Sequence, residues 1–344
     1  MEWVVAQHSK KEVARAGNTL IDAQADDQQR LAAMEVLSNW RAAHAYPMHA
    51  VLISLRNVVK KIDTTAIVAQ RLKRTPSIVG KLQRFQNMSL SRMQDIAGCR
   101  AVVKNARTVR LLSSTMIESR TRNRLHKKDD YIAEPKDSGY RGIHLVYKYN
   151  GEKKEYSDYF VEIQLRSKIQ HAWATAVEIV DTFTKQALKA SNGKTDWLDF
   201  FKYVSVEFAK IEKCPLHPIA NAVDTKSEVI RLANKLKVAN VLNAFAVSTR
   251  HLTKSTIKNN SYFLLELSEH ATKIFVTSFS ANQLEQATKI YLQKEEQAKI
   301  DDSYDVVLVA ANSVNSLKKA YPNYFADSKD FLKLLNSVTL TGVV

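Results

Sequence analysis

The sequence predicts an α+β fold in which a mixed β-sheet is flanked by helices, followed by a smaller α+β domain. Between residues 95 and 185, short segments typical of strands alternate with longer segments whose apolar residues recur every three or four positions. Their order is strand, helix, strand, strand, helix, which indicates one mixed sheet. The chain has 344 residues, more than one typical domain needs, so we expect two domains.

The expected elements can be justified in chain order. Residues 7–62 should be helical because their apolar residues recur at helical spacing, and Pro47 should begin a second helix rather than interrupt the first. Thr75-Pro76-Ser77 is typical of a helix start and introduces a basic helix. The next expected elements are a buried strand at 95–103, a helix at 107–120, strands at 142–150 and 156–167, and helical sequence from 169 to 212.

A boundary between two domains is expected near residues 213–221, where KCPLHPIAN holds two of the six prolines. We therefore divide the chain into domains 1–214 and 215–344. The second domain repeats a mixed pattern on a smaller scale. Its expected elements are a hairpin formed by SYFLLELS and ATKIFVTSFS, a helix from Asn282, the strand YDVVLVAA and a last helix.

The strongest signal of the whole composition is a net charge of +16, with an isoelectric point near 9.6. Such an excess favours a polyanionic partner, namely RNA, DNA, an anionic membrane surface or nucleotide phosphates. A solvated basic surface without a partner remains the alternative.

Two cysteines, Cys99 and Cys214, are too few for a disulfide framework or a structural zinc site, so we expect no zinc and a reducing cytosol. The N-terminus turns polar after two valines, which does not match a secretory signal peptide. No run of about 18 apolar residues occurs, so we expect a cytoplasmic protein without a membrane span.

Polar residues alternate along the segment FVEIQLRS. On a strand, alternate side chains share a face, so Glu162, Gln164 and Arg166 would line a cleft together. Asp95 stands at the mouth of a buried strand, and with Glu162 it would supply the carboxylates that Mg²⁺ usually takes beside substrate phosphates. The alternatives are a half-exposed strand edge for the first segment and a simple turn or helix cap for Asp95.

Cations dominate the segment RLKRTPSIVGKLQR, which contains no acid. Ser77 lies where a helix starts, so backbone N–H groups there would meet a phosphate, with Lys81 one turn further on. A solvated basic helix is the alternative. The Walker glycine pattern is missing, so a P-loop fold is not expected.

Glycines bracket one tyrosine and one arginine in a chain with only 8 glycines. Gly139 and Gly142 would let the backbone present Tyr140 as an exposed flat ring suited to stacking on a nucleobase, with Lys136 and Arg141 on phosphate. An ordinary surface turn is the alternative. In HAWATAVE, residues 171, 175 and 178 share one helical face, although a lone helical histidine is more often structural.

Taken in order, RLKRTPSIVGKL, MQDIAGCR, KDDYIAEPKDSGYRGIHLVY and VEIQLRSKIQHAWATAVE resemble the synthetase domain of the RelA/SpoT family. The resemblance covers residues 60–185 and implies a nucleotidyltransferase-like fold. Members of that family move pyrophosphate from ATP to a ribose hydroxyl. Most modify GDP or GTP and make the alarmone (p)ppGpp, whereas a toxic branch modifies the 3′ CCA end of tRNA.

The resemblance implies roles for individual residues. Asp95 and Glu162 would bind Mg²⁺, and Glu162 would also take the proton from the attacking hydroxyl. The implied ATP-binding residues are Arg71, Lys73, Ser77, Lys81 and Arg100, and the implied acceptor-binding residues are Lys128, Lys136, Tyr140, Arg141, His144, Gln164, Arg166 and His171. The sequence departs from the family at Ser167, where many relatives have Thr, and in KDDY, which doubles the usual single Asp.

The C-terminal segment resembles the second half of CapRel proteins, which are fused toxin–antitoxins with a C-terminal pseudo-zinc finger. AYPNYF, with Tyr321 and Tyr324, matches their YxxY element, which blocks the ATP site. The alternative is that both tyrosines are ordinary packing residues. The resemblance implies a monomeric chain whose C-terminal domain restrains the enzyme until a phage protein, expected to be the major capsid protein, releases it.

Three functions remain open. The leading interpretation is a tRNA pyrophosphokinase, with Arg120, Arg122, Arg124 and Lys127 as its tRNA surface, because tRNA needs cations beyond the pocket. The alternative is a small alarmone synthetase acting on GDP or GTP. A catalytically inactive RNA-binding module would use the basic surface without the carboxylates.

Overall fold

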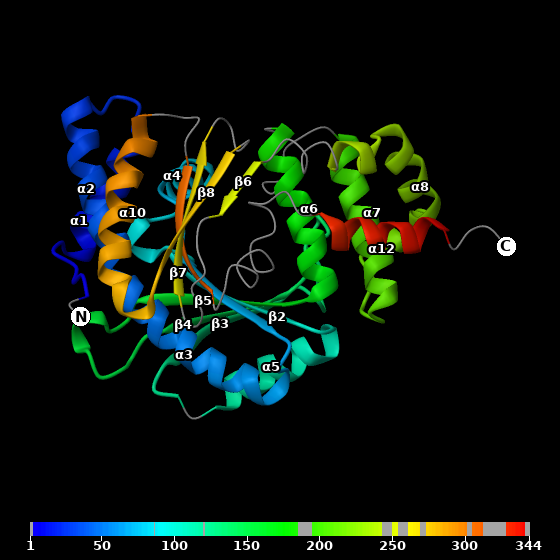
Figure 1. The fold of residues 1–344 in the computed structure, drawn as a ribbon, viewed down its shortest axis with the longest axis horizontal. Coiled ribbons are helices and arrows are strands. Elements are labelled where there is room, and N and C mark those ends of the chain that lie inside the picture. The colour runs from blue at the N-terminus through cyan, green and yellow to red at the C-terminus, as the bar shows by residue number, and fades with distance from the viewer. Residues whose placement is uncertain are drawn as a thin grey trace.

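The computed structural model describes residues 3–85, 87–119, 121–184, 195–242, 250–253, 261–268, 273–300, 305–311 and 328–340 (Figure 1). The expected α+β class is confirmed: a mixed sheet has helices packed on it and around it. None of the described helices has the length and apolar character that crossing a membrane requires.

The N-terminal region forms three helices, α1 (Lys10–Thr19), α2 (Asp27–Ala43) and α3 (Ala45–Ile62). Side-chain caps fix where the first two begin: Ser9 and Asp26 each accept a hydrogen bond from the third backbone N–H of their helix. The expected break near Pro47 is present, although α3 begins two residues earlier and holds Pro47 in its first turn.

One sheet of nine strands runs through the described residues in the order β3-β4-β5-β2-β1-β9-β7-β8-β6. Its first part consists of β1 (Ile67–Leu72), β2 (Ala97–Val103), β3 (Arg124–Asp130), β4 (Ile143–Lys148) and β5 (Phe160–Ser167). The pair β2–β5 is parallel, whereas β1–β2, β3–β4 and β4–β5 are antiparallel. Strands β1 and β3 were not expected: β3 is rich in cations, and β1 ends in the cationic segment that begins at Arg71.

Helices complete this half of the molecule. Their bounds are α4 (Thr75–Arg84), α5 (Ala106–Glu118), α6 (Lys168–Thr184) and α7 (Thr195–Ile211), with short 3₁₀ turns at Leu90–Arg92, Lys154–Tyr156 and Pro218–Asn221. The apolar alternates of β2, β4 and β5 pack on α3 and α5 in one buried cluster. The opposite alternates of the same strands therefore form a separate face, which carries the polar residues.

The C-terminal part continues the sheet. Its elements are α8 (Thr225–Lys235), β6 (Arg250–Thr253), β7 (Ser261–Ser268), β8 (Lys273–Phe279), a 3₁₀ turn at Ala281–Gln283, α10 (Leu284–Ile300), β9 (Asp305–Ala311) and α12 (Lys329–Leu340). The expected hairpin is the antiparallel pair β7–β8, and β9 joins the two parts because it pairs with β1. The division into domains 1–214 and 215–344 and the likeness to a pseudo-zinc finger stay predictions.

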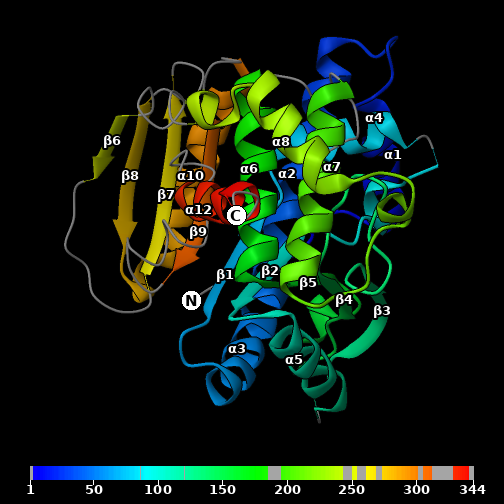
Figure 2. The same ribbon diagram turned by 90° about the vertical axis from the view of Figure 1, so that its right-hand side faces the viewer.

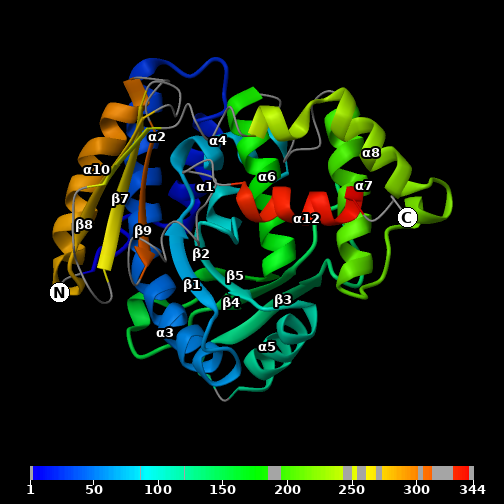
Figure 3. The same ribbon diagram turned by 45° about the vertical axis from the view of Figure 1, so that its right-hand side comes forward.

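A second core lies between helices. Residues of α6, α7, α8 and α12 form one buried cluster that includes Trp173, Phe201 and Phe331. Figure 3 shows α12 crossing α6 and α7, and Figures 2 and 3 show α8 alongside α7. Helices α6 and α7 therefore pack against α8 and α12, which belong to the C-terminal part of the chain.

Candidate active site

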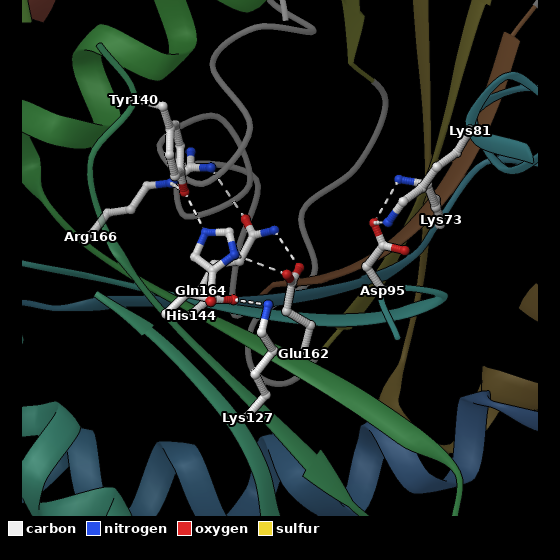
Figure 4. Close-up of polar contacts among 10 residues, drawn as sticks. Lys73, Lys81, Asp95, Lys127, Tyr140, His144, Glu162, Gln164 and Arg166 are labelled. Carbon is white, nitrogen blue, oxygen red and sulfur yellow. Dashed lines mark hydrogen bonds and ion pairs between the residues drawn. The ribbon is translucent and has the colours of Figure 1, made fainter. Parts of the chain in front are cut away.

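The first cluster of polar side chains lies where β1 ends and β2 begins. Because Leu72 pairs with Ala97 in the antiparallel register, the next residue, Lys73, meets the residues just before β2, and its N–H donates to the carbonyl of Ile96 at 2.8 Å. Asp95 accepts at Oδ2 from the Nζ atoms of Lys73 at 3.0 Å and Lys81 at 2.9 Å (Figure 4). We call Lys73, Lys81 and Asp95 the Asp95 cluster.

The Asp95 cluster leaves one acceptor unused. Oδ1 of Asp95 is buried and has no hydrogen-bond partner among the residues that the structure describes. Burial lowers the pKa of Lys73, with the charges of Lys81 and Arg71 acting in the same direction and Asp95 opposing them. A site with several cations around one acid is suited to hold phosphate.

The second cluster is a closed circuit of hydrogen bonds on β4, β5 and the loop before β4. His144 lies between Tyr140 and Glu162: its Nε2 is 2.6 Å from the Tyr140 hydroxyl and its Nδ1 is 2.9 Å from Glu162 Oε1. Gln164 Nε2 donates to Glu162 Oε2 at 2.7 Å, and Gln164 Oε1 accepts from Arg166 Nη2 at 3.2 Å. Arg166 Nε closes the circuit by donating to the Tyr140 hydroxyl at 3.1 Å. Figure 4 shows these five side chains, which we call the Tyr140 network.

Electrostatics within the Tyr140 network favour its charged forms. Burial alone would raise the pKa of Glu162, but the charge and hydrogen bond of His144, together with Gln164, lower it to about 2. Burial disfavours a charged imidazole, yet Tyr140 and Glu162 raise the pKa of His144 to about 9. Burial would raise the pKa of Tyr140, but Arg166 and His144 lower it to about 8. Glu162 and His144 therefore form an ion pair near neutral pH.

The two clusters are neighbours. The parallel register of β2 and β5 places Glu162 beside Gly98, three residues after Asp95. The charge of Lys73, which pairs with Asp95, also contributes to the low pKa of Glu162. Figure 4 shows Glu162 on the side of the Tyr140 network that faces the Asp95 cluster. The two carboxylates thus come from adjacent strands and share the electrostatic influence of one lysine.

A cavity of about 220 Å³ opens beside the Tyr140 network. Its polar lining includes Lys136, Ser138, Tyr140, His144, Arg166 and Glu178, and its apolar lining is Trp173, Ala174, Val177, Leu198 and Phe201. The lining from α7 lies outside the predicted synthetase region of residues 60–185. A flat aromatic or heterocyclic group fits such a wall, with charged groups at one end.

Tyr140 is held more firmly than the sequence suggested. We expected an exposed ring, but the ring is half-buried. The Nζ of Lys136 lies 5.4 Å from its centroid, and the guanidinium carbon of Arg166 lies 5.1 Å from it. The two glycines do adopt backbone conformations that other residues rarely adopt, since Gly139 has a φ of 88° and Gly142 a φ of 153°.

Arg141 points away from the cavity, contrary to our expectation of a phosphate contact. Its guanidinium is 4% exposed and donates to Ser205 Oγ at 3.2 Å and to the carbonyls of Ile132 at 3.3 Å and Pro215 at 2.8 Å. Tyr140 lines the cavity, whereas Arg141 is not part of its lining. Arg141 therefore holds the loop in place instead of lining the cavity.

Lys128 is also turned away from the network. Paired residues in a sheet share a face, and Lys128 pairs with buried Leu145 while Asp129 pairs with His144. An irregularity between Leu125 and Lys127 sets this register. Lys127, one residue earlier than Lys128, thus lies on the face of the Tyr140 network, where it pairs with Asp129 at 3.0 Å (Figure 4).

Two of the remaining predicted residues, Arg71 and Arg100, lie on the sheet face that carries Glu162. The pairings of β1, β2 and β5 place Arg71 beside Gly98 and Arg100 beside Gln164, on the face that carries Glu162. Ser77 lies in the first turn of α4, and His171 is buried on α6. Their binding roles, and those of the two clusters, stay predictions. Arg120, Tyr321 and Tyr324 lie outside the described residues.

Sequence reasoning missed Tyr131. Its ring meets those of Tyr140 and His144 edge-on, with centroids 5.8 and 5.2 Å apart, and Lys136 Nζ lies 4.3 Å above it. Burial, followed by the charges of Asp129 and Tyr140, raises the pKa of Tyr131 to about 12. The doubled acid of KDDY was the available signal, since its second Asp displaces Tyr131 by one position relative to KDY.

The proposed tRNA surface is largely neutralised in the described part of the chain. On and near the edge strand β3, Arg122 pairs with Glu152 at 3.2 Å and Arg124 with Asp158 at 3.9 Å. Both arginine side chains are 71% exposed, so these ion pairs are weak and an anionic ligand can compete with them.

The residues present fit a divalent cation in part. Within the described ranges there is no group of three or more His, Cys, Asp or Glu side chains placed to hold a metal ion. Two carboxylates with one buried, unpartnered oxygen nevertheless match the needs of Mg²⁺, which takes one or two protein carboxylates and completes its shell with water and phosphate. Asp95 offers that oxygen, whereas both oxygens of Glu162 are engaged.

Part of this chain is similar to known proteins. The model of the region found in RelA/SpoT proteins matches residues 70–181. The GTP pyrophosphokinase YjbM of Bacillus subtilis (strain 168) is 36% identical over 115 residues, which cover 31% of this chain and 52% of that protein. This chain thus spans about half the length of that curated relative.

Two solved structures are also similar. The small alarmone synthetase 1 from Bacillus subtilis bound to its product pppGpp has 25% identity and a TM-score of 0.41, covering 49% of this chain and 87% of that chain. A GTP pyrophosphokinase family protein from Streptococcus pneumoniae has 21% identity and a TM-score of 0.41, covering 54% of this chain and 92% of that chain.

None of these comparisons identifies a CapRel-type fusion, so that likeness stays a prediction. The expected resemblance over residues 60–185 is confirmed for most of its length, since residues 70–181 match the model of the region found in RelA/SpoT proteins.

Proposed function

We propose that this chain is a pyrophosphokinase that transfers the β- and γ-phosphates of ATP to the 3′-hydroxyl of GDP or GTP. The observation that carries the proposal is the placement of the Asp95 cluster beside the Tyr140 network within the matched region 70–181. One cluster is suited to a polyphosphate and the other to a nucleoside. Their adjacency suits transfer from one nucleotide to another, where positioning and charge neutralisation supply most of the catalysis.

On the donor side, Lys73 and Lys81 would turn from Asp95 to the ATP phosphates, helped by Ser77 and the first turn of α4. Asp95 would then be free to hold Mg²⁺ through its buried Oδ1. When bound, that ion supplies charge neutralisation at the phosphates. Arg71 and Arg100, on the same sheet face, would flank the adenine.

On the acceptor side, the cavity would receive guanine between Tyr140 and the apolar wall of α6 and α7. Lys136 and Arg166 line the same cavity and would meet the acceptor's phosphates. The acceptor hydroxyl would donate a hydrogen bond to Glu162. This places the hydroxyl between the two clusters, next to the donor phosphates.

In the reaction, the 3′-oxygen forms a bond to the β-phosphorus of ATP while the bond from that phosphorus to the α–β bridging oxygen breaks, and AMP leaves. The hydroxyl proton passes to Glu162. A carboxylate with a pKa of about 2 is a weak base, so Glu162 acts mainly by orienting the hydroxyl and accepts the proton late, once the new bond has made the oxygen acidic. A loose transition state for phosphoryl transfer does not require a stronger base than this carboxylate.

GDP or GTP is favoured over tRNA as the acceptor. The curated relative is named a GTP pyrophosphokinase, and none of the relatives or structures named above is named for tRNA. The exposed arginines near β3 form only weak ion pairs, which do not decide between the two acceptors. The alternative interpretation from the sequence is therefore the better supported one. Restraint by the C-terminal part and release by a phage capsid protein stay predictions, since Tyr321 and Tyr324 fall outside the described residues.

The test is a labelling experiment. The protein is incubated with ATP labelled at the γ-phosphate, Mg²⁺, and either GDP, GTP or deacylated tRNA, and Asp95→Asn serves as the inactive control. We expect label in a new guanosine polyphosphate together with AMP, and none in tRNA. Label in tRNA alone would move the assignment to the tRNA branch, and label in neither, with the protein folded and ATP bound, would reject the proposal.

A further inference from the structure

The backbone of Lys73 is fixed from two sides. Its N–H donates to the carbonyl of Ile96 at 2.8 Å, and its carbonyl accepts from Nε of Arg41 at 2.5 Å. Lys73 follows directly after β1, so these two hydrogen bonds determine the direction in which its side chain leaves the strand. The second bond comes from α2, a helix outside the matched region of residues 70–181.

Arg41 is itself held by the C-terminal part of the chain. Its side chain is only 1% exposed, and its Nη2 donates to the hydroxyl of Tyr291 on α10, 250 residues away in sequence. The guanidinium carbon also lies 4.9 Å from the centroid of the Tyr291 ring. Figure 1 shows α10 alongside the N-terminal helices. One tyrosine thus contacts this guanidinium through both its hydroxyl and its ring.

The chemistry of the contact makes Tyr291 important to Arg41. A buried guanidinium is costly unless hydrogen bonds and nearby electron density replace its hydration. The two acceptors named here are neutral oxygens, and the aromatic ring adds a cation–π interaction that is strongest where water is excluded. Without the hydroxyl, the guanidinium loses one of the contacts that hold it beside the carbonyl of Lys73.

A second contact ties the same strand to the C-terminal part. Strand β9 pairs with β1 at Gln70–Ala310 and Arg71–Val309, just before Lys73. Tyr262, Leu264 and Tyr291 belong to one buried cluster behind this pairing. The C-terminal part therefore holds β1 along its edge and, through Arg41, at its end.

We propose that Arg41 and Tyr291 are positioning residues for the ATP-phosphate site: the contact from α10 through Arg41 to the carbonyl of Lys73 holds the backbone of the lysine at the point from which its side chain can turn from Asp95 to the donor phosphates. The proposal rests on the function proposed above for Lys73. It makes the occupancy of the ATP site dependent on how α10 is seated, although Tyr291 touches neither substrate.

Tyr291→Phe tests the proposal because it removes the hydroxyl and keeps the ring. The matched control is Tyr262→Phe, which removes a buried hydroxyl from the same cluster, one that lies 3.4 Å from His49 Nδ1 on α3 and does not contact Arg41. We expect Tyr291→Phe to raise the KM for ATP about fivefold, the effect of losing one buried hydrogen bond, with kcat and the KM for GDP unchanged within about twofold. Tyr262→Phe should leave all three constants unchanged.

A binding measurement separates this proposal from the proposed function. The dissociation constant of trinitrophenyl-ATP is measured by fluorescence for both variants and the parent, with no acceptor present. If the parent binds the nucleotide but forms no product, the reaction assignment fails and the comparison of affinities still stands. Equal affinity of Tyr291→Phe and the parent overturns the positioning role, and so does an equal loss in both variants, since that would reflect general loosening of the C-terminal core.

Discussion

The Asp95 cluster and the Tyr140 network lie side by side but are built in opposite ways. In the Asp95 cluster, two lysines share one carboxylate oxygen while the other oxygen is buried without a partner. In the Tyr140 network, every one of five side chains is tied to two others in a closed circuit. The first is incomplete without a ligand, whereas the second is already satisfied.

This difference indicates how each half would meet its nucleotide. A charged cluster with unmet capacity gains hydrogen bonds when a polyphosphate and a cation arrive, so binding there should dominate the interactions with ATP. A closed network gains little from new hydrogen bonds and contributes rigid geometry instead. Variants of the two halves should therefore fail in different kinetic constants.

The largest effects are expected for the two carboxylates. Asp95→Asn removes the unpartnered anionic oxygen, and Glu162→Gln removes the acceptor of the hydroxyl proton together with the ion pair to His144. We expect each to lower kcat by about 10²- to 10³-fold in the GDP reaction, as loss of one preorganised charged group typically does.

The two variants should separate in ATP affinity. Asp95→Asn releases Lys73 and Lys81 from a competing acid, so the affinity for metal-free ATP should be higher, whereas Glu162→Gln should leave it unchanged. Isothermal titration with ATP in EDTA measures this difference. Retention of more than a third of the parental kcat by Asp95→Asn would remove that residue from the chemistry.

The next largest effect is expected at Tyr140. Tyr140→Ala removes the stacking surface of the cavity, which is worth about 1–3 kcal/mol per base, so the KM for GDP should rise about 5- to 150-fold while the KM for ATP stays unchanged. Tyr140→Phe keeps the ring and breaks only the hydrogen bonds to His144 and Arg166, so its effect on the KM for GDP should be smaller. Equal effects of Phe and Ala would mean that the hydroxyl, not the ring, serves the acceptor.

The sheet face of the site was predictable from the sequence because strand alternation is local. The alternation of FVEIQLRS placed Glu162, Gln164 and Arg166 on one face, and the register confirms it by pairing His144 with Gln164. The apolar alternates pack on α3 and α5 as the pattern required.

What could not be predicted depends on contacts distant in sequence. Arg141 is buried because Ser205 and Pro215, 64 and 74 residues further on, accept its hydrogen bonds. Strand β1 was missed because its last two residues belong to the cationic segment RLKRTPSIVGKLQR, and its outer partner is β9. The direction of a loop side chain and the choice of a strand partner follow from tertiary packing, which overrides local propensity.

A pH experiment sharpens the comparison at the level of stability. The pKa of Glu162 is lowered from 4.5 to about 2 and that of His144 is raised from 6.5 to about 9, so the contribution of their ion pair to stability is fully present between about pH 4.5 and 6.5. Its contribution should be lost as the pH falls through about 2 and as it rises through about 9. Tyr140, with its pKa lowered from 10.0 to about 8, works in the opposite sense, adding stability between pH 8 and 10.

The expected result is a decline in the free energy of unfolding between pH 6.5 and 8 that flattens above pH 8, with a total on the order of 2 kcal/mol. Urea denaturation in EDTA at pH 6.5, 8 and 9.5 measures it. His144→Gln is the control, and it should show a smaller decline from pH 6.5 to 8. A parent and control with parallel pH profiles would mean that the ion pair contributes no stability.

The smallest effect is expected outside both clusters, at the exposed cations near β3. Removing Arg122 and Arg124 together breaks two ion pairs whose arginines are 71% exposed, which changes the free energy of unfolding by less than about 1 kcal/mol. The kcat/KM for GDP should stay within about twofold of the parent, because a mononucleotide held in the cavity does not reach them.

If tRNA were the acceptor, each lost phosphate contact would reduce the salt dependence of binding by about one unit of slope. The measurement is kcat/KM for GDP and tRNA retention on a filter from 50 to 300 mM KCl, with Arg122→Lys/Arg124→Lys as the charge-preserving control. A tenfold loss of kcat/KM for GDP in Arg122→Ala/Arg124→Ala, but not in the lysine control, would show that the acceptor extends beyond the cavity and that the site is larger than the two clusters.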